Sequence, residues 1–303
     1  MNAPTEQTAS VGSTRLVNGA TRRRSVSRRL AGQAGPAAGL VVLVVAILCS
    51  VFAPVLTQYD PLRLNILDRL SPPSRVHLLG TDDFGRDVYS LVLYGGRASL
   101  LVGGLVMILT SVIGVAFGVV AGVNRVLDNV LMRIMDGLMA FPAIVLAIAL
   151  MAALGPRLSN VIIALSIVYA PRTARLIRST VVVIRELQYV EAAQALGAES
   201  ARILWRHILP NTIAPLLVQA TFMFAYAVLA EAALSFLGVG APPYIPTWGN
   251  IISTGRLYIQ DAPWIIWFPG LAIILVGLGL NLLGDGLRDL LDPRLRGASG
   301  ATN

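Results

Sequence analysis

Very few residues in this 303-residue chain could carry out acid–base or nucleophilic chemistry. The chain has 2 histidines, His77 and His207, a single cysteine, Cys49, and 16 acidic residues. All 24 basic residues are arginine, which excludes a phosphate-binding loop of the form G-x4-G-K-[ST], because that loop needs a lysine. One cysteine also excludes an intrachain disulfide. We expect no catalytic site, no metal site and no bound cofactor on this chain.

The composition indicates an integral membrane protein. Hydrophobic residues make up 55% of the chain, charged residues only 13%, and the mean hydropathy is +0.72. Soluble domains have about 25% charged residues. The net charge of +8 could suit nucleic acid or anionic lipid. Because the arginines flank apolar runs instead of forming one patch, we interpret them as topology signals and expect no nucleic-acid partner.

Six apolar stretches are long enough for membrane-spanning helices, which need about 20 residues each. The sequence therefore predicts an all-α membrane protein with six spans. They are 37–57, 98–122, 134–154, 159–176, 213–237 and 264–284.

The arginines predict the orientation of these spans. With a cytoplasmic N-terminus, 17 of the 24 arginines fall in inner segments, counting Arg172 and Arg175 with the inner flank of the fourth span. The positive-inside rule then places both termini in the cytoplasm. We expect a disordered tail over 1–36, a transmembrane domain over 37–293 with an outer loop at 58–97 and a cytoplasmic loop at 185–210, and a short tail over 294–303. The Ser27–Leu30 stretch hints at a twin-arginine signal, but the apolar run behind it is too long for a signal core.

The cytoplasmic loop combines small residues with charge between two apolar spans. Gly197 can adopt a positive φ and stop a first helix. A second helix is expected from Ala198 to Pro210, which should end it. We expect its apolar residues to face the membrane interface; these are Ile203, Leu204, Trp205 and Ile208. An ordinary amphipathic interfacial loop is the alternative.

Two further stretches carry charge near the outer face. In the first, Thr81 could cap a helix, and three charged residues could pair: Arg86, Asp87 and Arg97. In the second, Glu231 lies inside the fifth span, where a carboxylate either lines a water path or holds helices together. Trp248, beyond that span, is expected to be an interfacial anchor.

The loop resembles the EAA loop of ABC importer permeases, whose pattern is E-A-A-x3-G-x9-I-x-L-P. The matching residues are Glu191, Ala192, Ala193, Gly197, Leu209 and Pro210. His207 stands where the pattern has Ile, and the adjacent Ile208 could supply the apolar contact. In that family this loop is a coupling helix that docks on the ATPase, and the resemblance implies that role for these six residues.

Both outer stretches resemble the C component of peptide and nickel importer permeases. The first contains the pattern L-G-T-D-x-x-G-R-D, with matches at Gly80, Thr81, Asp82, Gly85, Arg86 and Asp87. The second, from Glu231 to Ile252, matches the family pattern E-x-x-L-S-F-L-G and its Pro-rich continuation. The resemblance covers about residues 37–293.

The resemblance implies a permease subunit in the bacterial cytoplasmic membrane. Its expected partners are a similar permease chain, two ATPase subunits or one fused ATPase, an extracytoplasmic solute-binding protein, and membrane lipid. ATP and Mg²⁺ would bind the ATPases, and no cofactor would bind this chain. Peptides are the favoured cargo, with nickel chelates and other small solutes left open.

Two other functions compete with this interpretation. An intramembrane aspartyl protease would need two carboxylates in one site. The topology places Asp60 and Asp285 at opposite ends of spans, about 30 Å apart. A channel or scaffold protein would have no ATPase partner, and co-purification from native membranes would distinguish it.

Overall fold

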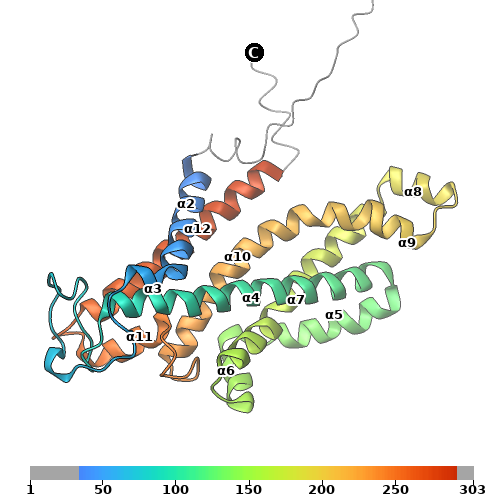
Figure 1. Cartoon of the computed structure of the whole chain (residues 1–303). Helices are drawn as coiled ribbons and strands as arrows, with labels where there is room; N and C mark the ends of the chain where they lie inside the picture. Colours follow the sequence, from blue (N-terminus) through green and yellow to red (C-terminus); the bar gives the residue numbers. More distant parts are fainter. Residues whose placement is uncertain (1–33, 292–303) are drawn as a thin grey trace, which may run out of the picture.

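The computed structural model describes residues 34–291, so most of the predicted tail 1–36 and all of 294–303 lie outside the described residues. Within this range the chain is helical, with one isolated β-bridge between Thr81 and Asp87. Figure 1 shows long helices packed along one another, with loops gathered at one end. The long helices are α2 (Ala34–Val51), α4 (Val88–Val123), α5 (Arg125–Met139), α6 (Ala143–Leu154), α7 (Leu158–Arg185), α10 (Leu209–Phe236) and α12 (Trp264–Leu291).

Short helices fill the connections. They are α3 (Ala53–Leu56), η1 (Ile66–Asp68), α8 (Gln188–Ala195), α9 (Ser200–Ile203), the π-helical turn η2 (Leu204–Ile208), α11 (Trp248–Gly255) and η3 (Arg256–Tyr258).

The all-α membrane fold predicted from the apolar runs is confirmed. Five helices in residues 34–291 are long and apolar enough to span a membrane, and the α5–α6 pair gives a sixth if it is counted as one bent span. Several helices exceed their predicted ends; α4 has 36 residues and α7 has 28. The longer α7 places Arg172, Arg175 and Arg178 inside one helix.

The predicted third span, 134–154, is not one straight helix. It contains the second half of α5 and all of α6, which meet at an angle of 92°. Pro142 stands at the N-cap of α6. Proline has no N–H to continue the helix of α5, and its ring disfavours helical geometry at the preceding residue. The chain therefore turns there.

Small residues allow the two central helices to pack closely. Gly114, Gly118 and Gly122 of α4 recur every four residues and lie against α7, where a Cβ added to Gly118 would come within 2.6 Å of the Ala174 carbonyl oxygen. Stripes of small residues are a common basis of helix association in lipid, since they let backbones approach. The α4–α7 pair is the most extensive helix contact in the described chain.

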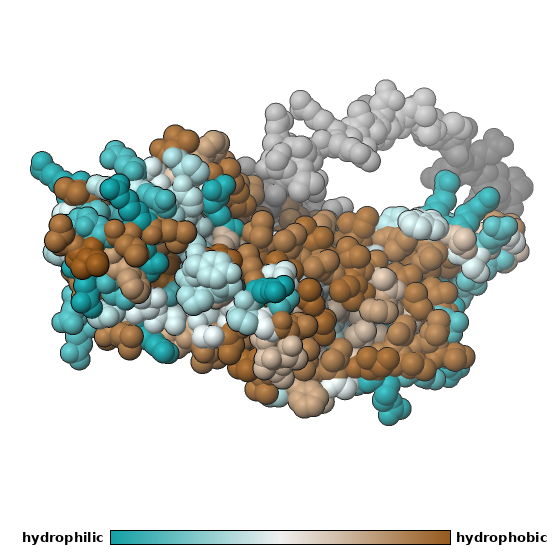
Figure 2. All heavy atoms as spheres, turned by 60° about the horizontal axis from the view of Figure 1, so that its bottom comes forward, coloured by the Kyte–Doolittle hydropathy of each residue, from teal (hydrophilic) through white to brown (hydrophobic). Residues whose placement is uncertain are grey.

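The molecule has two polar ends separated by an apolar middle. We call the end that carries α8 and α9 the hairpin end, and the opposite end, with residues 57–87 and α11, the loop end (Figure 1). Figure 2 shows hydrophilic residues gathered at these two ends and hydrophobic residues over the middle. This distribution is that of a membrane-embedded helical bundle.

Candidate functional site

The hairpin end is built around a tight turn after α8. Gly197 has φ +79° and follows Leu196, the C-cap of the helix. Its N–H bonds to the Gln194 carbonyl at 2.9 Å, and the Ala198 N–H bonds to the Ala193 carbonyl at 3.0 Å. These two bonds define a Schellman motif, which satisfies the last carbonyls of a helix and favours glycine at the left-handed position. The predicted helix stop at Gly197 is confirmed.

Buried aliphatic side chains attach this hairpin to the transmembrane helices. Val190 from α8 is fully buried, and Ile203 and Ile208 from the second arm pack in the same cluster with residues of α7. The prediction that Ile203 and Ile208 face the membrane interface was therefore wrong, because both are needed to join the hairpin to α7. Trp205 is largely exposed.

Pro210 does not end the second arm, contrary to prediction. The chain runs from α9 through η2 directly into α10, whose first residues are Leu209 and Pro210. In η2 the bonding widens to a π-helical turn, with the Leu209 N–H on the Leu204 carbonyl. A π-turn lets the helix continue past a residue that cannot donate, so Pro210 is tolerated at its start.

The tip of the hairpin exposes small, apolar and acidic groups. Glu191 and Ala192 are exposed, Ala193 is half-buried, and the Leu196 side chain is 89% exposed. Four of the six residues that match the EAA pattern therefore lie together on α8 and the following turn, while Leu209 and Pro210 lie at the far end of the second arm. An exposed leucine among small side chains is suited to contact with another protein.

The loop end is organised by Asp82, which is almost completely buried. One carboxylate oxygen accepts the backbone N–H groups of Phe84 at 2.9 Å and Arg86 at 2.8 Å, and the other accepts the Arg86 Nε–H at 2.6 Å. Buried carboxylates are stable when donors surround them in this way. Arg86 thus pairs with Asp82, and not with Asp87 as predicted.

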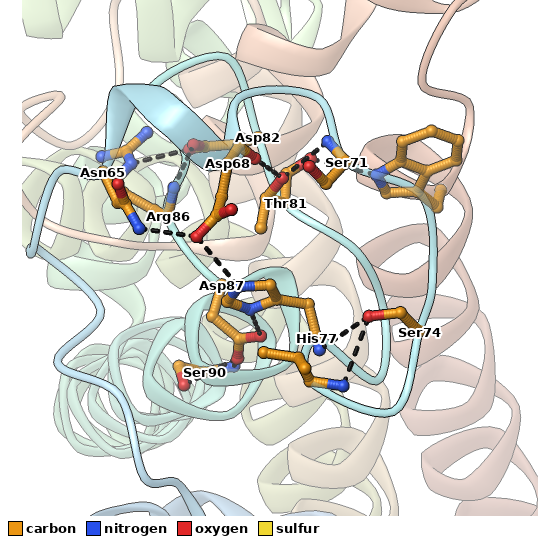
Figure 3. Close-up of polar contacts among 12 residues, drawn as sticks. Asn65, Asp68, Ser71, Ser74, His77, Thr81, Asp82, Arg86, Asp87 and Ser90 are labelled. Atoms are coloured by element: carbon orange, nitrogen blue, oxygen red, sulfur yellow. Dashed lines mark hydrogen bonds and ion pairs between the residues drawn. The ribbon is translucent and has the colours of Figure 1, made fainter.

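A second buried carboxylate lies at the start of α4. Asp87 is the N-cap and accepts from the Ser90 N–H at 2.8 Å, while its other oxygen lies 3.0 Å from His77 Nδ1 (Figure 3). An N-cap carboxylate satisfies helix N–H groups that lack partners. The predicted cap at Thr81 was wrong: its hydroxyl accepts the Ser71 N–H at 2.8 Å and donates to the Asp68 carbonyl. The predicted pairing of Arg97 is also absent from residues 34–291; its guanidinium lies over Tyr94.

Two glycines of this motif are fixed by both conformation and space. Gly80 and Gly85 have φ of +78° and +69°. A Cβ on Gly85 would lie 1.7 Å from the Asn65 carbonyl oxygen, and one on Gly80 would lie 2.6 Å from the Trp264 indole nitrogen. The six motif residues are therefore contiguous in space and build the loop end.

Asp83 differs from its neighbours in having one carboxylate oxygen without a partner within residues 34–291. Its Oδ1 atom is buried and has no hydrogen-bond partner in the described chain. Burial, and after it the adjacent Asp82 carboxylate, raise the pKa of Asp83. No sequence pattern predicted that the two consecutive aspartates would differ so much.

Glu231 lies near the loop end of α10 and is fully buried. Its two oxygens accept from the hydroxyls of Ser99 at 3.0 Å and Ser235 at 2.8 Å, so it joins α10 to α4. These contacts are the ones expected if Glu231 holds helices together, which was one of the two interpretations of this residue. Trp248 is only 3% exposed, and its indole N–H donates to the Val92 carbonyl at 2.9 Å, so the predicted interfacial anchor is instead part of the core.

Sequence reasoning missed several residues that hold these sites. His77 was considered only as one of the two histidines of the chain, yet it joins Asp87 to the outer loop, and Ser99 was not considered at all. Both become recognisable only once the fold brings distant segments together. Asp128 and Asp136 of α5 were also missed; they pair with Arg178 and Arg175 of α7.

Comparisons with known proteins agree with this geometry. Residues 114–297 match the family described as binding-protein-dependent transport system inner membrane component. Residues 21–73 match the N-terminal transmembrane domain of oligopeptide transport permease C.

Individual relatives extend the match over nearly the whole chain. A Brucella suis protein, whose name places it in a peptide transport system as a permease, is 52% identical over 89% of this chain and 91% of its own length. The dipeptide transport system permease of Alkalihalophilus pseudofirmus is 47% identical over 85% of each chain. The di/tripeptide transport system permease of Pseudomonas aeruginosa is 41% identical over 88% of this chain and 90% of its own.

A solved structure supports the same fold. The inward-facing MetNI methionine ABC transporter contains a chain that aligns with a TM-score of 0.56 at 21% identity, over 67% of this chain and 96% of that one. The helical bundle, its exposed hairpin and these matches lead to one conclusion: the chain belongs to the binding-protein-dependent transport system inner membrane component family, as a multi-pass, non-catalytic permease subunit of an ABC importer.

Proposed function

We propose that this permease imports di- or oligopeptides and forms half of the translocation pathway together with a second, similar permease chain. The peptide transport relatives at 41–52% identity support this cargo class. Its further partners would be two ATPase subunits, or one fused ATPase, and an extracytoplasmic solute-binding protein.

The hairpin end is the proposed contact with the ATPase. The observation that carries this proposal is the Schellman turn at Gly197, which presents Leu196, 89% exposed, beside the small side chains of α8. Val190 and Ile208 pack the base of the hairpin against α7, so a displacement of the tip would be transmitted to the long helices. A surface that docks on a moving ATPase needs both an exposed apolar contact and a firm base.

The loop end is proposed to face outward, toward the solute-binding protein, with both termini in the cytoplasm. The arginine distribution supports this orientation. In a Cys49→Ser background, a cysteine at Ser74 should react with a membrane-impermeant label from outside. A cysteine at Ser200 should react only after permeabilisation, and the reverse pattern would contradict the orientation.

The contact with the ATPase is tested by truncating Leu196. The side chain is almost wholly exposed, so Leu196→Ala should leave the fold of this chain intact. We expect the ATPases to be lost from the detergent-purified complex, or their hydrolysis to stop responding to loaded binding protein. Leu67→Ala, at the loop end where that leucine is 95% exposed, is the matched control and should retain the ATPases. Equal ATPase retention and stimulation in both variants would contradict the proposal.

A further inference from the structure

Three arginines follow one another along a single side of α7, at Arg172, Arg175 and Arg178. Residues three apart on a helix are neighbours on its surface. The two nearer the hairpin end pair with acidic residues of α5. Arg178 donates from Nη2 to Asp128 at 2.6 Å, and Arg175 pairs with Asp136.

Arg172 has no such partner. In residues 34–291 it forms no ion pair and no hydrogen bond, and its guanidinium lies over the ring of Tyr226 on α10, 5.7 Å from the centroid. Helix α5 ends at Met139, shortly beyond Asp136, and the chain bends away by 92°. The bend at Pro142 therefore removes the helix that would otherwise have continued beside Arg172.

A cavity occupies the position next to this bend. It has a volume of about 140 Å³ and is lined by Leu138, Met139, Phe141, Ala143, Val168, Tyr169 and Arg172. Arg172 supplies the only charge in this lining, with the phenol of Tyr169 beside it. The cavity has room for a carboxylate group with its neighbouring backbone atoms, against apolar and aromatic walls.

The position of Arg172 within α7 makes its lack of a partner significant. It stands at the middle of α7, fourteen residues from Leu158 and thirteen from Arg185, which is about 20 Å from either end at 1.5 Å per residue. A charged side chain inside a membrane-spanning helix is costly in lipid and normally faces protein or water. Arg172 and Tyr226 are nevertheless exposed in the isolated chain.

We propose that Arg172, with Tyr169 and Tyr226 beside it, is a binding site for the carboxylate of the transported solute during passage through the membrane. This deepens the proposed function and rests on it, since di- and oligopeptides carry a terminal carboxylate. Guanidinium is suited to a carboxylate, which it can bind through two parallel N–H bonds. The Tyr226 ring lies against the guanidinium and helps to orient it.

The test uses the complete transporter in vesicles, with radiolabelled alanyl-alanine and its C-terminal amide as probes. Each variant's uptake rate is divided by the wild-type rate for the same probe, so that any preference of the solute-binding protein cancels. We expect Arg172→Gln to slow uptake of the free acid about tenfold, as for loss of one charge-assisted hydrogen bond, and uptake of the amide less than twofold. Arg172→Lys should recover part of the free-acid rate.

The matched control is Arg175→Gln, one turn along the same face. Arg175 and its partner Asp136 are both about half-exposed, so loss of this pair should change either uptake rate less than twofold. Equal slowing of both probes by Arg172→Gln, or no slowing of either, would overturn the proposal. No uptake of either peptide by the wild-type complex would overturn the proposed peptide function instead.

A photoreactive residue identifies what occupies the cavity. With a benzoylphenylalanine at Phe141, irradiation during transport should attach the labelled peptide to this chain, and Arg172→Gln should reduce that yield. Attachment of the second permease chain, or of lipid, with no attachment of peptide would show that another group neutralises Arg172 and would overturn the proposal.

Discussion

The two ends of the molecule use left-handed glycines in different ways. At the loop end, a Cβ on Gly80 or Gly85 would collide with neighbouring atoms; at the hairpin end, a Cβ on Gly197 would meet nothing within 4 Å. All three have φ between +69° and +79°. The loop-end glycines are therefore fixed by packing as well as by conformation, whereas Gly197 is fixed by conformation alone.

The surrounding side chains show the same contrast. Asp82, Asp87 and His77 are buried and have partners at the loop end, while Glu191 and Leu196 are exposed at the hairpin end. Most of the loop-end motif thus completes the fold of this chain. The hairpin motif leaves a surface open, which is what a contact with a separate protein requires.

The largest expected effect comes from filling the space at Gly85. Gly85→Ala would place a methyl group against the Asn65 carbonyl at a left-handed φ, at a cost of at least about 3 kcal/mol. We expect little assembled complex and a strongly lowered melting temperature. Gly104→Ala in α4, where nothing lies within 4 Å, is the control and should be neutral. Normal yield of the Gly85→Ala complex would show that the loop end is less rigid than described.

The next effect concerns the hydrogen bonds of Glu231. Glu231→Leu would leave the Ser99 and Ser235 hydroxyls without their acceptor, which should cost about 2 kcal/mol and lower the yield of complex. Glu231→Gln keeps one of the two acceptor oxygens and should cost about 1 kcal/mol, less than Glu231→Leu. Complex yield measured beside uptake separates packing from a pathway role. A Glu231→Gln complex that assembles normally but transports poorly would favour the pathway.

Changes at the hairpin should affect coupling more than folding. Gly197→Val forces a β-branched residue to the left-handed φ at a cost of about 1–2 kcal/mol, confined to an exposed turn. Ala193→Trp adds bulk on the proposed docking face. We expect both variants to insert and bind the second permease chain, while stimulation of ATP hydrolysis by loaded binding protein falls about tenfold.

The milder variant Gly197→Asn checks the cause of that loss. Asparagine tolerates the left-handed region better than valine, so it should keep most of the stimulation. Normal stimulation in both Gly197→Val and Ala193→Trp would identify the segment as an amphipathic connector.

Sequence patterns predicted the helical membrane fold and the Gly197 turn because both depend on local features. Apolar length determines a span, and a glycine after an alanine-rich helix determines a C-cap. The partners of Trp248 and Glu231 depended on which distant segments meet, and a single sequence does not contain that information. Arg86 pairs locally with Asp82, four residues before it, which the motif pattern alone did not distinguish from pairing with Asp87. Pro210 was misinterpreted because a π-turn compensates locally for the missing donor. The 92° bend at Pro142 was missed because a hydropathy pattern does not report the angle between consecutive helices.

The smallest expected effect distinguishes two adjacent aspartates of the loop end. The pKa of Asp83 is raised by burial, so its ionised form is less stable in the folded chain than in the unfolded chain. Its contribution to stability is therefore present below the ordinary pKa of an aspartate, 3.8, and is lost as the pH rises through the higher folded pKa. Asp83→Asn removes the cost of holding an ionised carboxylate in this buried position. The variant should therefore raise the melting temperature at pH 7.5 by about 2 °C or less.

The difference between Asp83→Asn and wild type should shrink once the pH of the melting experiment falls through the raised folded pKa of Asp83. Asp82→Asn is the matched control, because Asp82 accepts three donors, and this variant should lower the melting temperature. A lower melting temperature for Asp83→Asn at pH 7.5 would mean that the Asp83 carboxylate has a partner in the assembled transporter. The loop end would then, like the hairpin end, contain a side chain that contacts another protein.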